Sequence, residues 1–139
     1  MTAPEPGDDQ TTVAELQKLV QDFVAEREWS VYHSPKNLAG SIAIEAAELM
    51  EHFQWIDETA SCAVADDPEA RAAAGEELAD VVGYSLAMAS ALKIDLARAV
   101  RDKMRKNHAK YPADAYRGKP SYETPEGADL DLREDVGDD

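Results

Sequence analysis

Two pairs of acidic residues lie inside otherwise apolar helical patterns, and this combination constrains the chain most. Glu45 and Glu48 are three residues apart, so they share one face of a helix, and Glu77 and Asp80 repeat that spacing. Isolated carboxylates are costly to desolvate, so such pairs require a partner that offsets the cost. The apolar neighbours are Ile42, Leu49 and Phe53 for the first pair and Leu78, Val81, Val82 and Leu86 for the second.

Apolar residues at helical spacing predict four helices, and there is almost no β-branched alternation. Short connections between these helices predict an all-α fold, a four-helix bundle. Residues 57–66 have no apolar period, and we expect a loop there. The predicted helices cover about 13–28, 35–54, 68–92 and 96–111, with Thr12, Ser34, Asp67 and Asp95 as their N-terminal caps.

The charge is unevenly distributed along the chain, and this distribution predicts three regions. The net charge is −15, and residues 120–139 hold eight acids against Arg133 alone. We therefore expect a disordered N-terminus at 1–10, a helical domain at 11–118 and an acidic disordered tail at 119–139. Residues 98–119 are basic, but the acidic remainder would repel phosphate chains, so long nucleic acid is not an expected partner.

The single cysteine, Cys62, excludes a disulfide within the chain and favours a reducing compartment. The first ten residues have neither a basic start nor an apolar run, and no later segment approaches the about 20 apolar residues that span a bilayer. The sequence therefore predicts no export, no membrane contact and a cytoplasmic location.

A divalent cation is the simplest partner for the four acids. If the second and third helices pack side by side, Glu45, Glu48, Glu77 and Asp80 converge and offer oxygen ligands alone, the set that Mg²⁺ or Mn²⁺ prefers. The alternative is that each pair is a solvated helix face or pairs with the basic fourth helix. A di-iron bundle is disfavoured because its Glu-x-x-His pairs are missing; His52 stands four residues after Glu48.

Acidic, basic and aromatic residues form spaced motifs along the chain. The motifs are Glu45-x-x-Glu48 with Phe53-Gln54-Trp55, Glu76-Glu77-x-x-Asp80-Val81 and Lys103-x-x-x-Asn107-x-x-x-Tyr111-Pro112, preceded by Trp29, His33, Pro35, Asn37 and Leu38. Over residues 16–119 this pattern resembles the MazG-like, all-α nucleoside triphosphate pyrophosphohydrolases, and most closely their dCTP pyrophosphatase branch. The general MazG motif opens with adjacent glutamates, whereas Ile44 precedes Glu45 here, which favours that branch over MazG proper.

This resemblance implies Mg²⁺-dependent hydrolysis of a nucleoside triphosphate, with dCTP or a modified dCTP as the expected substrate, to the monophosphate and pyrophosphate. Such chemistry needs neutralised phosphate oxygens, a positioned water and a cation for the leaving group. Glu48 or Glu51 is the candidate to orient the water, and Lys103 the candidate cation. Glu45, Glu48, Glu77 and Asp80 are the implied metal ligands.

The nucleotide needs a flat, partly apolar slot and phosphate contacts. We expect Trp29 and Trp55 to stack on the base and His33 and Tyr84 to contact base or sugar, although each of these is also compatible with core packing. Lys103, Asn107 and Tyr111 share one helical face and are candidates for phosphate contact.

Two alternatives remain at this point: the same chemistry on dUTP or a broad set of nucleotides, or a non-catalytic module that binds nucleotide or metal. Surplus apolar surface on the third helix indicates subunit contacts. MazG-like proteins work as dimers or tetramers, so the resemblance implies a homo-oligomer.

Overall fold

The computed structural model describes residues 6–120, which contain helices and no strand. The all-α class predicted above is therefore confirmed. The chain divides into two compact units: the first ends at Ala97 and the second begins at Arg98. The helices are α1 (Val13–Glu26), η1 (Trp29–Tyr32), α2 (Pro35–Glu51), α3 (Glu58–Ala63), η2 (Val64–Asp66), α4 (Pro68–Ala91), α5 (Leu96–Lys110) and α6 (Ala113–Tyr116).

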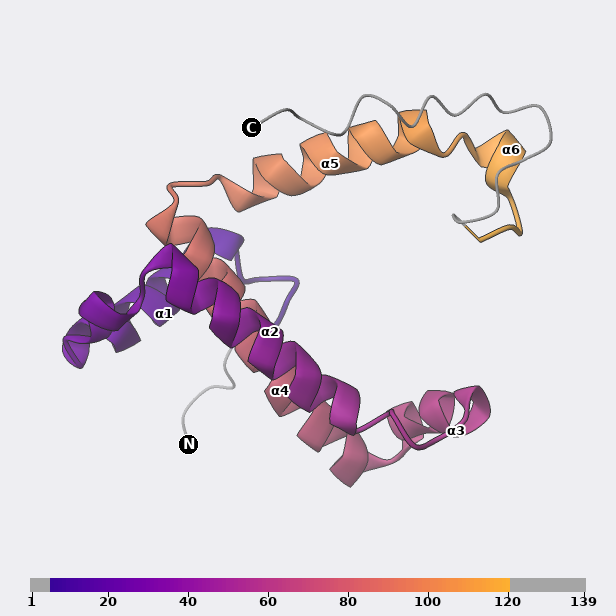
Figure 1. The fold of residues 1–139 in the computed structure, drawn as a ribbon, viewed down its shortest axis with the longest axis horizontal. Coiled ribbons are helices and arrows are strands. Elements are labelled where there is room, and N and C mark those ends of the chain that lie inside the picture. The colour runs from indigo at the N-terminus through magenta and orange to yellow at the C-terminus, as the bar shows by residue number, and fades with distance from the viewer. Residues whose placement is uncertain (1–5, 121–139) are drawn as a thin grey trace. The chain divides into compact units, whose positions relative to one another are not determined.

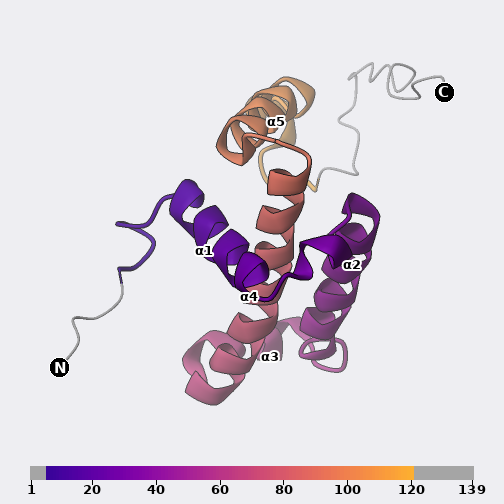
Figure 2. The same cartoon turned by 90° about the vertical axis from the view of Figure 1, so that its left-hand side faces the viewer.

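In the first unit, α4 is the central helix. It packs mainly against α2 and also against α1. Helices α2 and α4 lie side by side and run in opposite directions (Figure 1). Figure 2 shows α1 and α2 on different sides of α4. Leu38 of α2 and Leu86 of α4 are buried within this arrangement, at 2% and 4% exposure.

At three of the four predicted positions, the N-terminal cap forms as the local sequence predicts. The Thr12 hydroxyl accepts a bond from the Glu15 N–H and the Glu15 carboxylate accepts one from the Thr12 N–H, which completes a capping box. Ser34 caps α2 by accepting from the Asn37 N–H, and Asp67 caps α4. Helix α5 begins at Leu96, directly after Asp95, and the cap by Asp95 stays a prediction.

The prediction of a loop over residues 57–66 is wrong, because this segment contains the short helices α3 and η2. Asp57 starts α3 by accepting a hydrogen bond from the Ala60 N–H at 2.8 Å, and the Ser61 hydroxyl donates to the Glu58 carbonyl. The segment has small and polar residues without an apolar period, so local caps rather than a buried face define these helices. Helices α1 and α2 also end two to three residues earlier than expected, at Glu26 and Glu51.

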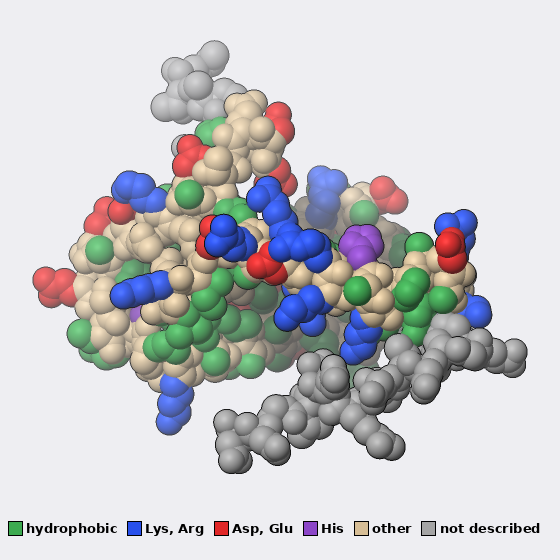
Figure 3. Space-filling model, turned by 90° about the horizontal axis from the view of Figure 1, so that it is seen from above, with side chains coloured by type: hydrophobic (Ala, Val, Ile, Leu, Met, Phe, Trp, Pro, Cys, Tyr) green, Lys and Arg blue, Asp and Glu red, His purple; other side chains and the backbone are tan. Residues whose placement is uncertain are grey.

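Many large apolar side chains of the described residues lie at the surface, and hydrophobic patches interrupt the charged ones in Figure 3. Within residues 6–120 no helix combines the length and the apolar character needed to cross a membrane. Residues 1–5 of the expected disordered N-terminus and residues 121–139 of the expected acidic tail lie outside the described residues. Residues 6–10 are described and contain a turn, in which the Gln10 N–H donates to the Gly7 carbonyl at 3.0 Å. The single domain expected at 11–118 stays a prediction. Buried apolar residues are Val24, Leu38, Leu86, Ala89 and Tyr116.

We expect Asp67→Ala to lower the free energy of unfolding by about 1 kcal/mol, because the Asp67 carboxylate accepts from the N–H groups of both Glu69 and Ala70. Urea denaturation followed by circular dichroism measures this loss. The matched control is Asp66→Ala, which removes the adjacent acid without removing a cap and should change stability by less than about 0.5 kcal/mol. Equal losses in the two variants would contradict the assigned cap.

Candidate active site

Three carboxylates from two helices meet between α2 and α4. Glu45 and Glu48 lie one turn apart on α2, and Glu77 lies on the facing part of α4. Each offers one oxygen, and these oxygens all lie within 4.8 Å of one another. In the described part of the first unit, no lysine or arginine forms an ion pair with these acids. The side-by-side packing of α2 and α4 therefore brings together three of the four predicted ligands.

Asp80 lies one turn after Glu77 on α4 and is close enough to act electrostatically on the cluster. Partial desolvation and the negative charges of Glu48, Asp80 and Glu77 raise the pKa of the Glu45 carboxyl. A bound cation would reverse this effect by favouring the charged form. The donors are all carboxylate oxygens, so the site fits a hard divalent cation such as Mg²⁺.

A cavity of about 430 Å³ adjoins the acids in the same unit. Its walls come from α1, η1, α4 and the residue His33, and they are largely apolar. Polar groups enter at His33, Asp80 and Tyr84, so Asp80 belongs both to the acidic region and to the cavity. We call this cavity the aromatic slot; it is lined by Leu19, Val20, Phe23, Val24, Trp29, His33, Asp80, Gly83, Tyr84 and Ala87.

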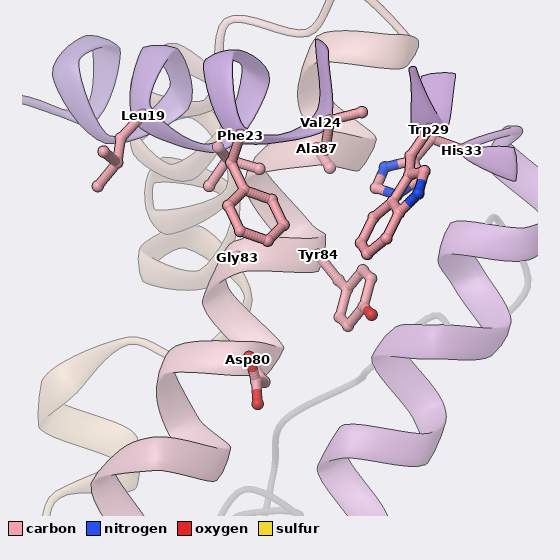
Figure 4. Close-up of a pocket in the computed structure, with 10 residues that line it drawn as sticks. Leu19, Phe23, Val24, Trp29, His33, Asp80, Gly83, Tyr84 and Ala87 are labelled. Carbon is pink, nitrogen blue, oxygen red and sulfur yellow. The ribbon is translucent and has the colours of Figure 1, made fainter. Parts of the chain in front are cut away.

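The rings of the aromatic slot contact one another in pairs. Phe23 and Trp29 meet edge to face, with centroids 5.9 Å apart and planes at 76°. His33 lies 6.3 Å from Tyr84. Figure 4 shows these rings directed into the space between α1 and α4, with Asp80 one turn from Tyr84 along α4. The cavity thus combines aromatic and apolar walls with a few polar groups, which is typical of small-molecule binding sites.

Hydrogen bonds in the connection between η1 and α2 fix the backbone around His33. The Asn37 side-chain amide donates to the Tyr32 carbonyl at 3.0 Å, and the Asn37 backbone N–H donates to the Ser34 hydroxyl at 3.3 Å. The His33 N–H donates to the Ser30 carbonyl. One cavity is therefore lined by Trp29, His33 and Tyr84, which were predicted from the sequence as separate candidates.

The structure does not place Trp55 with the other slot residues. Helix α2 ends at Glu51, and turns at residues 52–56 carry the chain away, so Trp55 is 87% exposed and outside the slot lining. Glu51 is the last residue of α2 and is exposed, and it is not part of the three-carboxylate cluster.

Lys103, Asn107 and Tyr111 belong to the second unit. The Tyr111 N–H donates to the Asn107 carbonyl at 2.8 Å. The Tyr111 ring meets Tyr116 edge to face at 5.2 Å, and both Asn107 and Tyr111 are half-buried. Their role in phosphate contact stays a prediction.

The apolar part of the slot was not predicted from the sequence. Val20, Phe23 and Val24 have the spacing of ordinary core residues on an amphipathic helix, and Gly83 and Ala87 carry no chemical signal. Spacing alone does not distinguish a residue that contacts the core from one that lines a cavity beside it.

We expect Glu45→Gln to raise the unfolding midpoint of the metal-free protein at pH 7. Folding raises the pKa of the Glu45 carboxyl above its ordinary value of 4.5. Protonation of Glu45 therefore stabilises the folded state, and this stabilisation is fully present below pH 4.5 and is lost as the pH rises through the folded-state pKa. The gain from Glu45→Gln should therefore vanish below about pH 4.5. Thermal unfolding in EDTA across this pH range measures it.

The control is Glu76→Gln, which neutralises an exposed acid beside Glu77 but outside the cluster. This variant should not raise the midpoint. A lower midpoint for Glu45→Gln at pH 7 would contradict the assigned repulsion.

Comparisons with known proteins agree with this geometry. Residues 41–121 match the model of the MazG-like family. Over 116 residues the chain is 40% identical to dCTP pyrophosphatase 1 of Rattus norvegicus, which covers 84% of this chain and 65% of the rat protein. The chain thus spans about two thirds of the length of that relative.

Two further relatives extend the comparison. The chain is 38% identical over 128 residues to dCTP pyrophosphatase 1 of Homo sapiens, which covers 91% of this chain and 72% of the human protein. The crystal structure of a pyrophosphatase from Archaeoglobus fulgidus superposes with a TM-score of 0.68 at 38% identity, covering 78% of this chain and 99% of the archaeal one. With its acidic helices and all-helical fold, this chain belongs to the MazG-like family.

Proposed function

We propose that this protein hydrolyses a nucleoside triphosphate to its monophosphate and pyrophosphate, with dCTP or a modified dCTP as the preferred substrate and Mg²⁺ as the cofactor. The observation that carries the proposal is the position of Asp80, which joins the carboxylate region to the aromatic slot within one unit. A nucleotide has the same two parts, a charged phosphate chain and a flat base. The names of the rat and human relatives support dCTP as the substrate.

In this proposal Glu45, Glu48, Glu77 and Asp80 hold the cation beside the phosphates. Mg²⁺ would neutralise the phosphate oxygens and lower the pKa of a bound water. We assign the orientation of the attacking water to Glu48, because Glu48 is exposed within the carboxylate cluster. Glu51 lacks such a contact, and its catalytic role stays a prediction. Trp29, His33 and Tyr84 would hold the base and sugar in the aromatic slot.

Lys103, Asn107 and Tyr111 are proposed to bind the phosphate chain. Lys103 and Asn107 are one turn apart on α5, and Tyr111 continues the same face. The Lys103 ammonium would stabilise the charge that develops on the departing pyrophosphate. A cytoplasmic location agrees with the single, exposed Cys62.

We also propose that the protein acts as a homo-oligomer, a dimer or a tetramer. Within the first unit, exposed apolar side chains outnumber the buried ones, and they include Leu19, Ile44, Met50 and Leu78. Trp55 is 87% exposed and outside the slot of its own chain. An exposed tryptophan next to an apolar surface is typical of a side chain that a partner subunit covers. Trp55 is thus proposed to contact the base in the slot of a neighbouring subunit.

We expect Glu48→Gln and Asp80→Asn each to lower Mg²⁺-dependent turnover of dCTP by at least about 100-fold, because each removes a charge from the proposed cation site. Phosphorus NMR of the products distinguishes pyrophosphate release from orthophosphate release. A panel of dCTP, dUTP, dTTP and CTP identifies the preferred substrate.

The control for this experiment is Glu69→Gln, an exposed acid in the first turn of α4 that should leave turnover unchanged. Full activity in folded Glu48→Gln and Asp80→Asn would refute the metal-site assignment. Thermal stabilisation by nucleotide without any product would instead identify a non-catalytic binding module.

Co-expression of Trp55→Ala with Asp80→Asn chains tests the shared site. If a partner's Trp55 completes the slot, each mixed dimer contains one intact site out of two. The activity of the mixture should then exceed the mean activity of the two separate variants. In a random mixture of dimers it should reach about a quarter of the wild-type value. Size-exclusion chromatography with light scattering gives the oligomeric state. Activity equal to that mean, or a monomeric mass, would contradict the shared site.

A further inference from the structure

Arg27, the residue that follows α1, makes three contacts at the end of that helix. Its guanidinium carbon lies 3.6 Å from the centroid of the Phe23 ring. One of its nitrogens donates to the Phe23 carbonyl at 2.9 Å and lies 3.4 Å from a Glu26 carboxylate oxygen. A stacked ring and two polar contacts hold the guanidinium in one orientation, so it covers the Phe23 ring with a planar cation.

The Phe23 ring connects Arg27 to the aromatic slot, because it contacts both Arg27 and Trp29. Phe23 meets Trp29 edge to face, and both rings line the slot, as Figure 4 shows. Phe23 is 48% exposed and Trp29 is 45% exposed, so neither ring is fixed by burial in a core. The orientation of each ring therefore depends on its few direct neighbours, and Arg27 is a direct neighbour of Phe23.

The backbone between Arg27 and Trp29 supports this arrangement. Glu28 has a φ of 56°, in the left-handed region that residues other than glycine seldom adopt. Its N–H donates to the Ala25 carbonyl at 3.0 Å. This turn ends α1 and starts η1, so that Arg27 and Trp29, two residues apart, both contact the ring of Phe23. Arg27 itself does not line the slot.

We propose that Arg27 is a positioning residue for the nucleobase: it holds Phe23, and through Phe23 it holds Trp29, so that the wall of the aromatic slot is ordered before the nucleotide binds. The inference rests on the function proposed above. A preformed wall lowers the cost of ordering side chains on binding. Because Arg27 contacts neither the slot interior nor the carboxylate cluster, its loss should weaken ground-state and transition-state binding equally, which raises KM and leaves kcat unchanged.

A purely structural role makes a different prediction. The bond from Arg27 to the Phe23 carbonyl satisfies a free acceptor at the end of α1, where a cation is also favoured by the helix dipole. If Arg27 only terminates the helix, its loss would lower stability without changing KM. Arg27→Lys separates the two roles, because lysine keeps the charge and a donor but lacks the planar face.

The first experiment is a double-mutant cycle on Arg27 and Phe23, read as KM and kcat for dCTP. A cation–π contact at an exposed site corresponds to about a two- to fivefold change in an equilibrium constant. We expect Arg27→Ala to raise KM by about that factor at unchanged kcat, and Arg27→Lys to raise it by less. In a Phe23→Leu background, Arg27→Ala should have no further effect on KM.

Lys18→Ala is the matched control, since Lys18 is an exposed cation on the same helix that pairs with Asp22 instead of a ring. It should leave KM unchanged. The proposal is overturned if folded Arg27→Ala has the wild-type KM, or if Arg27→Ala raises KM by the same factor with Leu at position 23.

The second experiment does not depend on turnover. In a Trp55→Phe chain, Trp29 is the only tryptophan, so its fluorescence reports on the slot wall directly. We expect Arg27→Ala to shift the Trp29 emission and to lower its anisotropy in the nucleotide-free protein, whereas Lys18→Ala should not. An unchanged Trp29 signal overturns the proposal even if the chain hydrolyses dCTP. Absence of hydrolysis in the wild-type chain would refute the proposed function alone, because the fluorescence still decides whether Arg27 orders Trp29.

Discussion

The antiparallel contact between α2 and α4 is the constraint on which the rest of the structure depends. It places Glu45 and Glu48 opposite Glu77, with oxygens within 4.8 Å of one another. Like charges at this distance oppose the packing that brings them together. Buried leucines on the same two helices, Leu38 and Leu86, favour it, and each contributes about 1.5–3 kcal/mol on burial. Apolar packing therefore holds the two helices together against the repulsion between the carboxylates, and a cation bound at the cluster would relieve that repulsion.

Helix α4 connects this cluster to the aromatic slot. Glu77, Asp80 and Tyr84 follow one another at intervals of three and four residues, so they lie along one side of the helix. Asp80 lies between the cluster and the slot: its charge acts on Glu45, and its side chain lines the slot together with Tyr84. A helix that changes from acidic to aromatic over two turns gives the proposed nucleotide its orientation, with phosphates at one end and the base at the other.

Local chemistry made much of this structure predictable. Thr12, Ser34 and Asp67 start helices where their caps indicated, and the paired spacing of the acids indicated that two helices would present carboxylates. The short helix α3 was missed because it has no apolar period, although Asp57 followed by Glu58 is a helix-start signal.

Features that depend on packing between helices were not accessible from the sequence. Phe23 has the spacing of a core residue, and only the crossing of α1 over α4 turns its ring into a slot wall. Trp55 is exposed and outside the slot because α2 ends at Glu51, three residues before the expected boundary. The contact of Arg27 with Phe23 depends on the left-handed turn at Glu28, which no residue preference indicates.

The most direct test of the central claim is the anomalous X-ray scattering of crystals grown with Mn²⁺ and a non-hydrolysable dCTP analogue. The proposed site predicts a manganese peak between α2 and α4, within about 2.0–2.3 Å of oxygens from Glu45, Glu48 and Glu77, with the analogue's base beside Trp29 and Tyr84. A manganese peak elsewhere, or a nucleotide bound with no metal at these carboxylates, would contradict the claim that this cluster is the catalytic metal site.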